Sequence, residues 1–453
     1  MRESLALFLN PFFDGRYEDM AQGWQKTVFR DFTAGLIVAM VAIPLAMGFA
    51  IASGLHPVHG IVGGAFAGLL GSLFGGSKYQ VYGPTAAYIP IIAGVMATYA
   101  AASTDPTSPE YAAGYGVLIL CSVMAGICLM VLGFLKVGSF VQKVPHSIVV
   151  GFTIGIAATI ALTQIGDMLG IQEKIPYAFL PKVGVIAANI DQFNPWSLAL
   201  ALGTFFVTRW LINTSVYIPG PLVAVGICYV LGQTLLSDVG LTVSSDKYGP
   251  IPTEEFFKFT PPVIPELSAS VAFDLLYFTV AIVFVAAVES LLCSRMADRM
   301  AHNKGTTYNP NKELFGQGMV NTFVPLLNGF PHTGALARTA TNIKVGAVTP
   351  LAGILKCILK LAMAFYLASV LDLVPMASIG GILAYIAFNM VKREEISIVM
   401  VTSRFHVFLM VYTAVVVLVT DFLTGVLTAL LLYGVLGRFF DGSRARAKEV
   451  LGA

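Results

Sequence analysis

Stretches of about 20 apolar residues follow one another along most of this chain, and each is long enough to cross the roughly 30 Å hydrocarbon layer of a membrane. Inside a bilayer such segments have to be helices, because only a helix closes its backbone hydrogen bonds within one segment. The composition agrees, since 57% of the 453 residues are hydrophobic and only 11% are charged. We therefore predict an all-α polytopic membrane protein.

Fourteen apolar runs are separated by turn residues and charges. They begin near Asp31, Val58, Pro84, Ala113, Ser147, Pro195, Pro219, Val271, Asn311, Gly334, Pro350, Pro375, His406 and Asp421. If the amino terminus is cytoplasmic, every even-numbered run should end in a basic loop. The loops at these places carry Lys78, Lys136, Lys143, Arg209, Arg295, Arg299, Lys304, Lys312, Lys344, Lys392, Arg393 and, in the tail, Arg438, Arg444, Arg446 and Lys448. Both termini are therefore predicted to be cytoplasmic.

A polar, proline-rich segment at residues 238–270 separates seven runs from seven. Because seven is odd, a repeated seven-span unit has to enter the membrane in opposite orientations, as in many secondary transporters. We predict five regions along the chain. They are a cytoplasmic or interfacial segment at 1–30, a first repeat at 31–237, an extracytoplasmic linker at 238–270, a second and inverted repeat at 271–440, and a short cytoplasmic tail at 441–453.

The third run of each predicted repeat is interrupted at its start. GGSKYQVYGPTAAY, residues 75–88, precedes the third run, and NGFPHTGALARTATN, residues 328–342, precedes the tenth. In both, a short apolar or β-prone run meets a turn, and a short helix follows. We expect one half-helix to begin at Gly83 or Pro84, with the proline in its first turn. The other should begin near Thr333 or Gly334, with the threonine as its cap.

Two half-helices that start inside a membrane leave unpaired backbone N–H groups where water is scarce. Their amino termini carry partial positive charge, so a pair of them facing each other suits an anion. Arg338 lies one turn into the second half-helix and adds a full positive charge. We therefore predict a small-anion site at this junction. The alternative is that Arg338 has a structural role or extends to the membrane interface.

At these residues the chain resembles the sulfate permease (SulP) family of anion transporters, most closely its bacterial C4-dicarboxylate- and bicarbonate-type members. The similar blocks are FRDFTAGLIVAMVAIPLAMGFAIASG, YGPTAAY, AAVESLLCSRMADRM, NPNKELFGQGMVN and GALARTATN. The resemblance implies a fourteen-span inverted repeat with core and gate domains, and anion uptake by an elevator-like motion. This chain differs from the family pattern in three respects. His59 stands where the family usually has tyrosine, Leu45 stands where many members have glutamine, and no STAS domain follows the last run.

The resemblance also implies which residues contact the anion. Carried over by position, they are Phe49, Gly83, Pro84, Thr85, Ala86, Gly334, Ala335, Leu336, Ala337 and Arg338. Phe49 could equally be an ordinary packing residue, as aromatic residues in membrane spans usually are. Because leucine at position 45 removes a polar group from the expected pocket, the resemblance does not indicate which anion this chain would bind.

Glu289 is the one carboxylate near the middle of an apolar run, which we place at about 271–300. Carboxylates inside a membrane are costly and tend to mark ion pathways. We interpret Glu289 as the proton-coupling residue, and a structural ion pair with Arg338 is the alternative. A sodium site is disfavoured because Arg338 repels a cation.

Other polar residues receive structural interpretations. Glu313, Gln317 and Asn321 follow one helical face and should hold helices together. Lys356 and Lys360 are one turn apart and should extend to the cytoplasmic interface. The five cysteines show no paired spacing, and the histidines no metal-ligand spacing, so we predict no metal and no cofactor. The absence of a phosphate loop, a nucleophile elbow or paired catalytic acids argues against an enzyme.

The leading hypothesis is a proton-coupled secondary transporter for a small anion, namely a dicarboxylate, bicarbonate or sulfate, in a bacterial inner membrane. An anion channel or exchanger with the same pocket is one alternative, and sodium-coupled bicarbonate uptake is another. A nucleobase–cation symporter would need carboxylates rather than Arg338 at the site. The partners expected are the anion, the coupling ion and the lipid bilayer, with a homodimer left open. A net charge of +2 gives no reason to expect nucleic acid.

Overall fold

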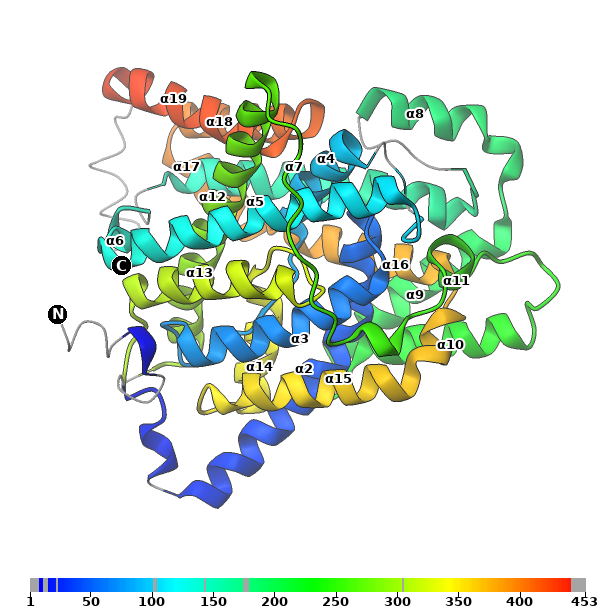
Figure 1. Cartoon of the computed structure of the whole chain (residues 1–453), viewed down its shortest axis with the longest axis horizontal. Helices are drawn as coiled ribbons and strands as arrows, with labels where there is room; N and C mark the ends of the chain where they lie inside the picture. Colours follow the sequence, from blue (N-terminus) through cyan, green and yellow to red (C-terminus); the bar gives the residue numbers. More distant parts are fainter. Residues whose placement is uncertain are drawn as a thin grey trace.

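A computed structural model of the chain describes residues 8–10, 15–21, 23–100, 103, 105–141, 144–173, 179–303 and 305–440. The predicted tail at 441–453 lies outside the described residues, as do Lys143, Lys304 and part of the predicted segment at 1–30. The described part is built of helices, with one two-stranded sheet at its centre (Figure 1).

The predicted first repeat is helical along most of its length, and the linker contains two short helices. In chain order these are η1 Glu18–Met20, α2 Trp24–Ala52, α3 Pro57–Phe74, η2 Ala86–Tyr88, α4 Ile89–Tyr99, α5 Pro109–Phe134, α6 Gly138–Val141, α7 His146–Leu169, α8 Phe179–Ala188, η3 Ile190–Gln192, α9 Pro195–Thr214, α10 Gly220–Gln233, α11 Ser244–Tyr248 and η4 Thr253–Glu255. Strand β1, Tyr82–Gly83, lies between α3 and η2.

The second part of the chain is also mostly helical. Its helices are α12 Ala269–Met300, α13 Pro310–Leu326, α14 Leu336–Val345, α15 Leu351–Asp372, α16 Met376–Met390, α17 Arg393–Thr402, α18 Arg404–Val419 and α19 Phe422–Phe440. Strand β2, Thr333–Gly334, lies between α13 and α14.

A helix begins close to each of the fourteen predicted starts. The largest difference is at α2, which begins at Trp24 because the polar stretch before Asp31 continues the same helix. Helices α8 and α17 are additional and short. By length and composition, seven of the described helices could each cross a membrane, and four shorter apolar helices accompany them. These helices make the chain an integral membrane protein.

The helices pack in two groups. The first consists of α2, α3, α4, α5, α12, α13, α14 and α15, and the second of α7, α9, α10, α16, α18 and α19. Figure 1 shows α5, α13 and α3 of the first group side by side, with α15 next to α3. Each group combines helices from both parts of the chain. The groups meet mainly where α16 and α10 pack on α2.

Glycine permits the closest of these helix contacts. A Cβ atom on Gly126 of α5 would lie 2.7 Å from the carbonyl oxygen of Gly318 in α13, and a Cβ on Gly318 would lie 2.6 Å from that of Gly126. The two backbones therefore touch, as small residues allow in membrane helix pairs. This contact fixes α13, which carries many of the polar residues of the first group.

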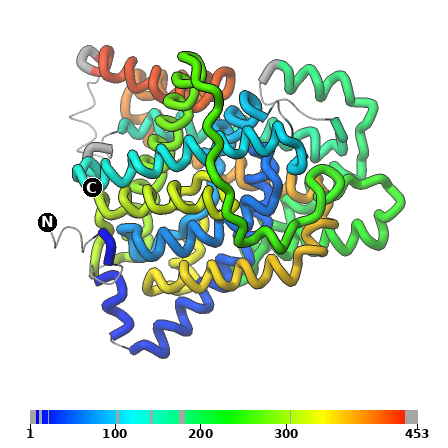
Figure 2. The backbone as a smooth tube through the Cα atoms, viewed as in Figure 1, coloured from blue at the N-terminus to red at the C-terminus, as the bar shows by residue number. Residues whose placement is uncertain are grey.

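The segment between α10 and α12 crosses the front of the molecule (Figure 2) and binds both helix groups. Lys247 forms an ion pair of 2.6 Å with Asp167 of α7, in the second group. From Ile251 onward the contacts are with the first group: the Ile251 amide donates to Asp372 of α15 at 2.8 Å, and the Val263 amide donates to the carbonyl of Gly116 in α5 at 3.0 Å. The segment thus connects the two helix groups across one face of the molecule.

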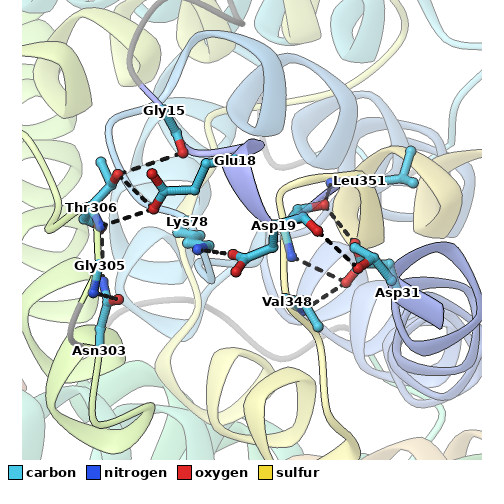
Figure 3. A network of polar contacts seen from close by, with 12 residues as sticks. Gly15, Glu18, Asp19, Asp31, Lys78, Asn303, Gly305, Thr306, Val348 and Leu351 are labelled. Atoms are coloured by element: carbon cyan, nitrogen blue, oxygen red, sulfur yellow. Dashed lines mark hydrogen bonds and ion pairs between the residues drawn. The ribbon is translucent and has the colours of Figure 1, made fainter. Parts of the chain in front are cut away.

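Residues 15–31 attach the beginning of the described chain to the ends of several helices of the first group (Figure 3). Asp19 forms an ion pair with Lys78, and Glu18 accepts a hydrogen bond of 3.1 Å from the Thr306 hydroxyl. Asp31 accepts hydrogen bonds from the amides of Val348 and Thr349 at 2.7 and 3.2 Å. Since α15 begins at Leu351, Asp31 supplies acceptors to the loop that precedes it.

Candidate functional site

The two interrupted segments meet in an antiparallel pair of strands. Tyr82 of β1 is opposite Gly334 of β2, and Gly83 is opposite Thr333. The Ala335 amide also donates to the Val81 carbonyl at 2.8 Å. This pairing satisfies backbone groups that would otherwise be unpaired in the interior of the first helix group. It also holds the starts of the two following helices close together.

Both helices begin later than the sequence predicts. Pro84 and Thr85 precede the first helical residue, Ala86, and the proline in the first turn of α4 is Pro90. Thr333 is in β2 and does not cap α14, and its hydroxyl donates to the Ala286 carbonyl at 3.3 Å. The predictions that Pro84 lies in the first turn of its helix and that Thr333 caps the other helix are therefore wrong. The physical reason is the β1–β2 pairing, which keeps the chain extended through these residues.

Among the described residues, the first turns of the two helices have no side-chain cap for their backbone N–H groups. Thr85 is the N-cap of η2 and Ala335 that of α14. The first N–H groups of a helix have no acceptor within it, and they carry the positive end of the helix dipole. Ala337, in the first turn of α14, is exposed. The two termini therefore offer hydrogen-bond donors and partial positive charge to a ligand.

Arg338 links the two termini. Its side chain is only 4% exposed, and Nη2 donates to the carbonyl of Pro84 on the other interrupted segment. Nη1 is buried and has no hydrogen-bond partner among the described residues. A Cβ atom on Gly83 would lie 2.6 Å from Nη1, so the guanidinium rests against the backbone of Gly83. Arg338 thus combines a full charge with an unused donor at this place.

Glu289 approaches the same place from α12. Its Oε2 accepts a hydrogen bond of 2.9 Å from the Thr85 hydroxyl, and its side chain is half-buried. Among the described residues Glu289 forms no ion pair with Arg338, so the predicted alternative of a structural pair is not found. The carboxylate is attached to the first interrupted segment and keeps an oxygen without a protein donor among the described residues.

The remaining candidates fall into two sets. Phe49 is buried in the apolar cluster that also contains Leu45 and Ala86. Gly334 and Ala335 are buried and belong to the strand pair and its continuation, whereas Leu336 is half-buried at the start of α14. The structure therefore brings Gly83, Pro84, Thr85, Glu289 and Arg338 into direct contact through the interactions described above.

A polar network positions the segment that leads into β1. Glu313 of α13 is fully buried and accepts hydrogen bonds from the Gly76 amide at 2.8 Å, the Gln80 side chain at 2.8 Å and the Tyr82 hydroxyl at 2.7 Å. Asn321 exchanges hydrogen bonds with the backbone of His332, of 2.9 and 3.0 Å. Glu313 and Gln317 both bond the Ser290 hydroxyl of α12, which confirms that they hold helices together, whereas the Asn321 side chain instead bonds the segment before β2.

Two lysines of α15 lie elsewhere than predicted. Lys356 and Lys360 are 1% and 0% exposed, and their ammonium groups donate to the carbonyls of Tyr82 and Gly60 at 2.6 and 3.2 Å. The prediction that they extend to the cytoplasmic interface is wrong. The reason is that α3 has Gly64 and Gly68 where they pass, and a Cβ atom there would lie 2.5 Å from Lys360 Nζ and 2.6 Å from Lys356 Nζ.

Together these features define a helical integral membrane protein in which two interrupted segments pair through β1 and β2. The amino termini of the following helices, Arg338 and Glu289 meet there. A sequence profile of the sulfate permease family matches residues 28–413. The chain therefore belongs to the sulfate permease family, which consists of transporters and not of enzymes.

Individual relatives agree with this assignment. The chain is 35% identical over 423 residues to the putative sulfate transporter YvdB of Bacillus subtilis strain 168. The aligned region covers 93% of this chain and 75% of that protein. It is 28% identical over 362 residues to the bicarbonate transporter BicA of Picosynechococcus, covering 79% of this chain and 61% of BicA's length.

A solved structure has the same fold. The transmembrane domain of a cyanobacterial bicarbonate transporter BicA aligns with a TM-score of 0.74 at 24% identity, over 88% of this chain and 97% of that domain.

Proposed function

We propose that the chain is a secondary active transporter that moves a small anion, a dicarboxylate, bicarbonate or sulfate, across a bacterial inner membrane. The observation that carries the proposal is Arg338, whose buried Nη1 has no partner among the described residues, at the junction of two helix termini that no described side chain caps. A buried charged donor without an acceptor is costly. An anion bound between the termini supplies the missing acceptor.

The proposal extends to the architecture. The first helix group, α2–α5 with α12–α15, corresponds to a core that carries the anion, and the second group to a gate. Fourteen spans form two inverted repeats on either side of the linker at 238–270, with both termini cytoplasmic. The matching strand–helix units β1–η2–α4 and β2–α14 support this arrangement, because inverted repeats place such broken helices at the substrate site.

The coupling ion in this proposal is the proton, carried by Glu289. Its carboxylate contacts Thr85 at the start of η2, so a change in its charge acts directly on the anion-binding residues. Sodium is the less favoured coupling ion, because Arg338 lies at the same junction and repels a second cation.

Transport by purified protein in liposomes tests the proposal. Uptake of labelled succinate, fumarate, bicarbonate and sulfate should show at least one substrate that accumulates under an inward proton gradient. Counterflow separates a carrier from a channel, since only in a carrier does unlabelled anion on one side of the membrane accelerate the entry of labelled anion from the other side. Absence of binding and uptake for all four anions would exclude the proposed substrate range, and flux without counterflow would favour a channel.

Gly83→Ala is expected to weaken anion affinity by about tenfold, equivalent to about 1.4 kcal/mol. The new Cβ would lie 2.6 Å from Arg338 Nη1, so the guanidinium has to move away from the junction. Anion affinity and thermal stability are measured on the same purified variant. Gly226→Ala on α10 is a matched control, because no described atom lies within 4 Å of its Cβ position. Normal affinity in Gly83→Ala would show that the observed position of Nη1 does not matter for binding.

Locking the two helix groups together should stop transport and leave anion binding intact. A Cβ on Gly48 of α2 would lie 3.0–3.2 Å from the side chain of Leu383 in α16, where the groups meet. Cysteines at these two positions, in a chain whose five native cysteines are replaced, can be joined by oxidation or by mercury. Transport should fall on joining and return with reductant. Full transport by the joined protein would contradict an elevator-like motion of one group against the other.

A further inference from the structure

Lys356 and Lys360 are buried basic side chains that contact no carboxylate among the described residues. Their ammonium groups donate to backbone carbonyls, that of Tyr82 for Lys356 and that of Gly60 for Lys360. Among the described residues neither lysine forms an ion pair. Burying a charge without an opposite charge is unfavourable, so two such groups on neighbouring turns of one helix call for an explanation.

Both ammonium groups lie beside the proposed anion site. Lys356 donates to Tyr82, which is in β1 and precedes Gly83. The Cβ position of Gly64 is 2.5 Å from Lys360 Nζ and 2.9 Å from Cδ of Pro84, so the ammonium group and the proline ring pack on the same glycine. Arg338 donates to the carbonyl of that same proline. Three cations therefore surround the tripeptide Tyr82–Pro84.

The carboxylates of Glu313 and Glu289 form no ion pair with these lysines among the described residues. Glu313 accepts hydrogen bonds from Gly76, Gln80, Tyr82 and Ser290, which belong to the network behind β1. Glu289 accepts from Thr85 on the other side of the break. Among the described residues, three basic side chains and two carboxylates therefore meet around the break, with Arg338 bonded to Pro84 and the lysines bonded to β1 and α3.

We infer that Lys356 and Lys360 determine the charge specificity of the site: they favour a doubly charged anion over a singly charged anion of the same shape. This inference rests on the proposed anion transport. The lysines do not have to touch the anion. At an effective dielectric constant of about 20, a unit positive charge about 10 Å from the anion strengthens binding by roughly tenfold for each negative charge that the anion carries.

The test measures the affinity ratio for matched anions that differ by one charge. Suitable pairs are succinate with its monoamide succinamate, and sulfate with methyl sulfate, titrated into the purified full-length protein. Lys356→Gln and Lys360→Gln keep an N–H donor for the Tyr82 or Gly60 carbonyl and remove the charge. Each should reduce the preference for the dianion by about tenfold, and the double variant should reduce it further.

A purely structural role for the lysines gives a different pattern. It lowers thermal stability and weakens both members of a pair equally, so the ratio stays at the parent value, and that result would overturn the inference. Thr339→Val is the matched control, because the Thr339 hydroxyl accepts a hydrogen bond of 2.9 Å from the Val81 amide in the same segment without carrying charge. Its ratio should equal that of the parent.

A substitute variant and the binding measured for the parent protein keep the test decisive. If a Gln variant does not fold, the corresponding Met variant, which preserves the length of the apolar stem, takes its place with the same expected ratio. A parent protein that binds none of the four probes and takes up no bicarbonate would overturn the proposed function itself. A parent that binds a pair, with unchanged ratios in the lysine variants, would overturn only the role assigned to Lys356 and Lys360.

Discussion

Arg338→Ala is expected to weaken anion binding by about tenfold to a hundredfold. At an effective dielectric constant near 20, a unit charge about 4 Å from an anion contributes roughly 4 kcal/mol before desolvation is subtracted. Much of that is offset, which leaves about 1–3 kcal/mol for a hydrogen bond to a charged group. About 1.4 kcal/mol corresponds to one decade of affinity. The measurement is anion affinity of the purified variant by calorimetry.

Arg338→Lys separates charge from geometry. Lysine retains the charge but loses the planar guanidinium, whose Nη2 binds the Pro84 carbonyl while Nη1 has no partner among the described residues. We expect it to recover only part of the lost affinity. If Arg338 only supports the fold, Arg338→Ala should instead lower thermal stability and bind anion as tightly as the parent. The helix termini alone would then form the site.

The positions of the helices could be predicted from the sequence because their signals are local. Apolar runs bounded by proline, glycine and charge place helix starts such as Pro57, Pro195 and Pro310 close to where the structure has them. The two breaks at corresponding places could also be recognised, since each combines glycine and proline with a short following helix. Arg338 was identifiable as a candidate because a charge inside an apolar chain is rare.

What could not be predicted depends on contacts between distant segments. The pairing of Tyr82 with Gly334 keeps Pro84 and Thr333 extended, and rules for helix capping assume that the chain is free to enter the helix. The burial of Lys356 likewise depends on Gly68 in another helix. The small residues one turn apart in α3 were a signal that a neighbouring helix would pack closely, but they did not reveal that a lysine would occupy the space.

Glu289→Gln is expected to abolish anion uptake driven by a proton gradient while anion binding and exchange continue. Glutamine has nearly the same shape, and its carbonyl oxygen can still accept the hydrogen bond from the Thr85 hydroxyl. It cannot take up and release a proton, so the cycle loses its coupled ion and keeps its anion site. Gradient-driven uptake and counterflow of labelled anion are measured in the same proteoliposome preparation.

The matched control for this variant is Asp274→Asn. It makes the same carboxylate-to-amide change nearer the beginning of α12, at a residue that does not bond the Thr85 hydroxyl. It should leave gradient-driven uptake unchanged. Thr85→Val removes the hydroxyl that donates to Glu289, and we expect it to alter the pH dependence of uptake without removing coupling. Gradient-driven uptake at the parent rate by a folded Glu289→Gln protein would leave Glu289 a structural role, and the proton would have to be carried elsewhere. Loss of both uptake and exchange in that variant would instead make the carboxylate part of the anion site, because exchange needs an intact binding site but no coupled proton.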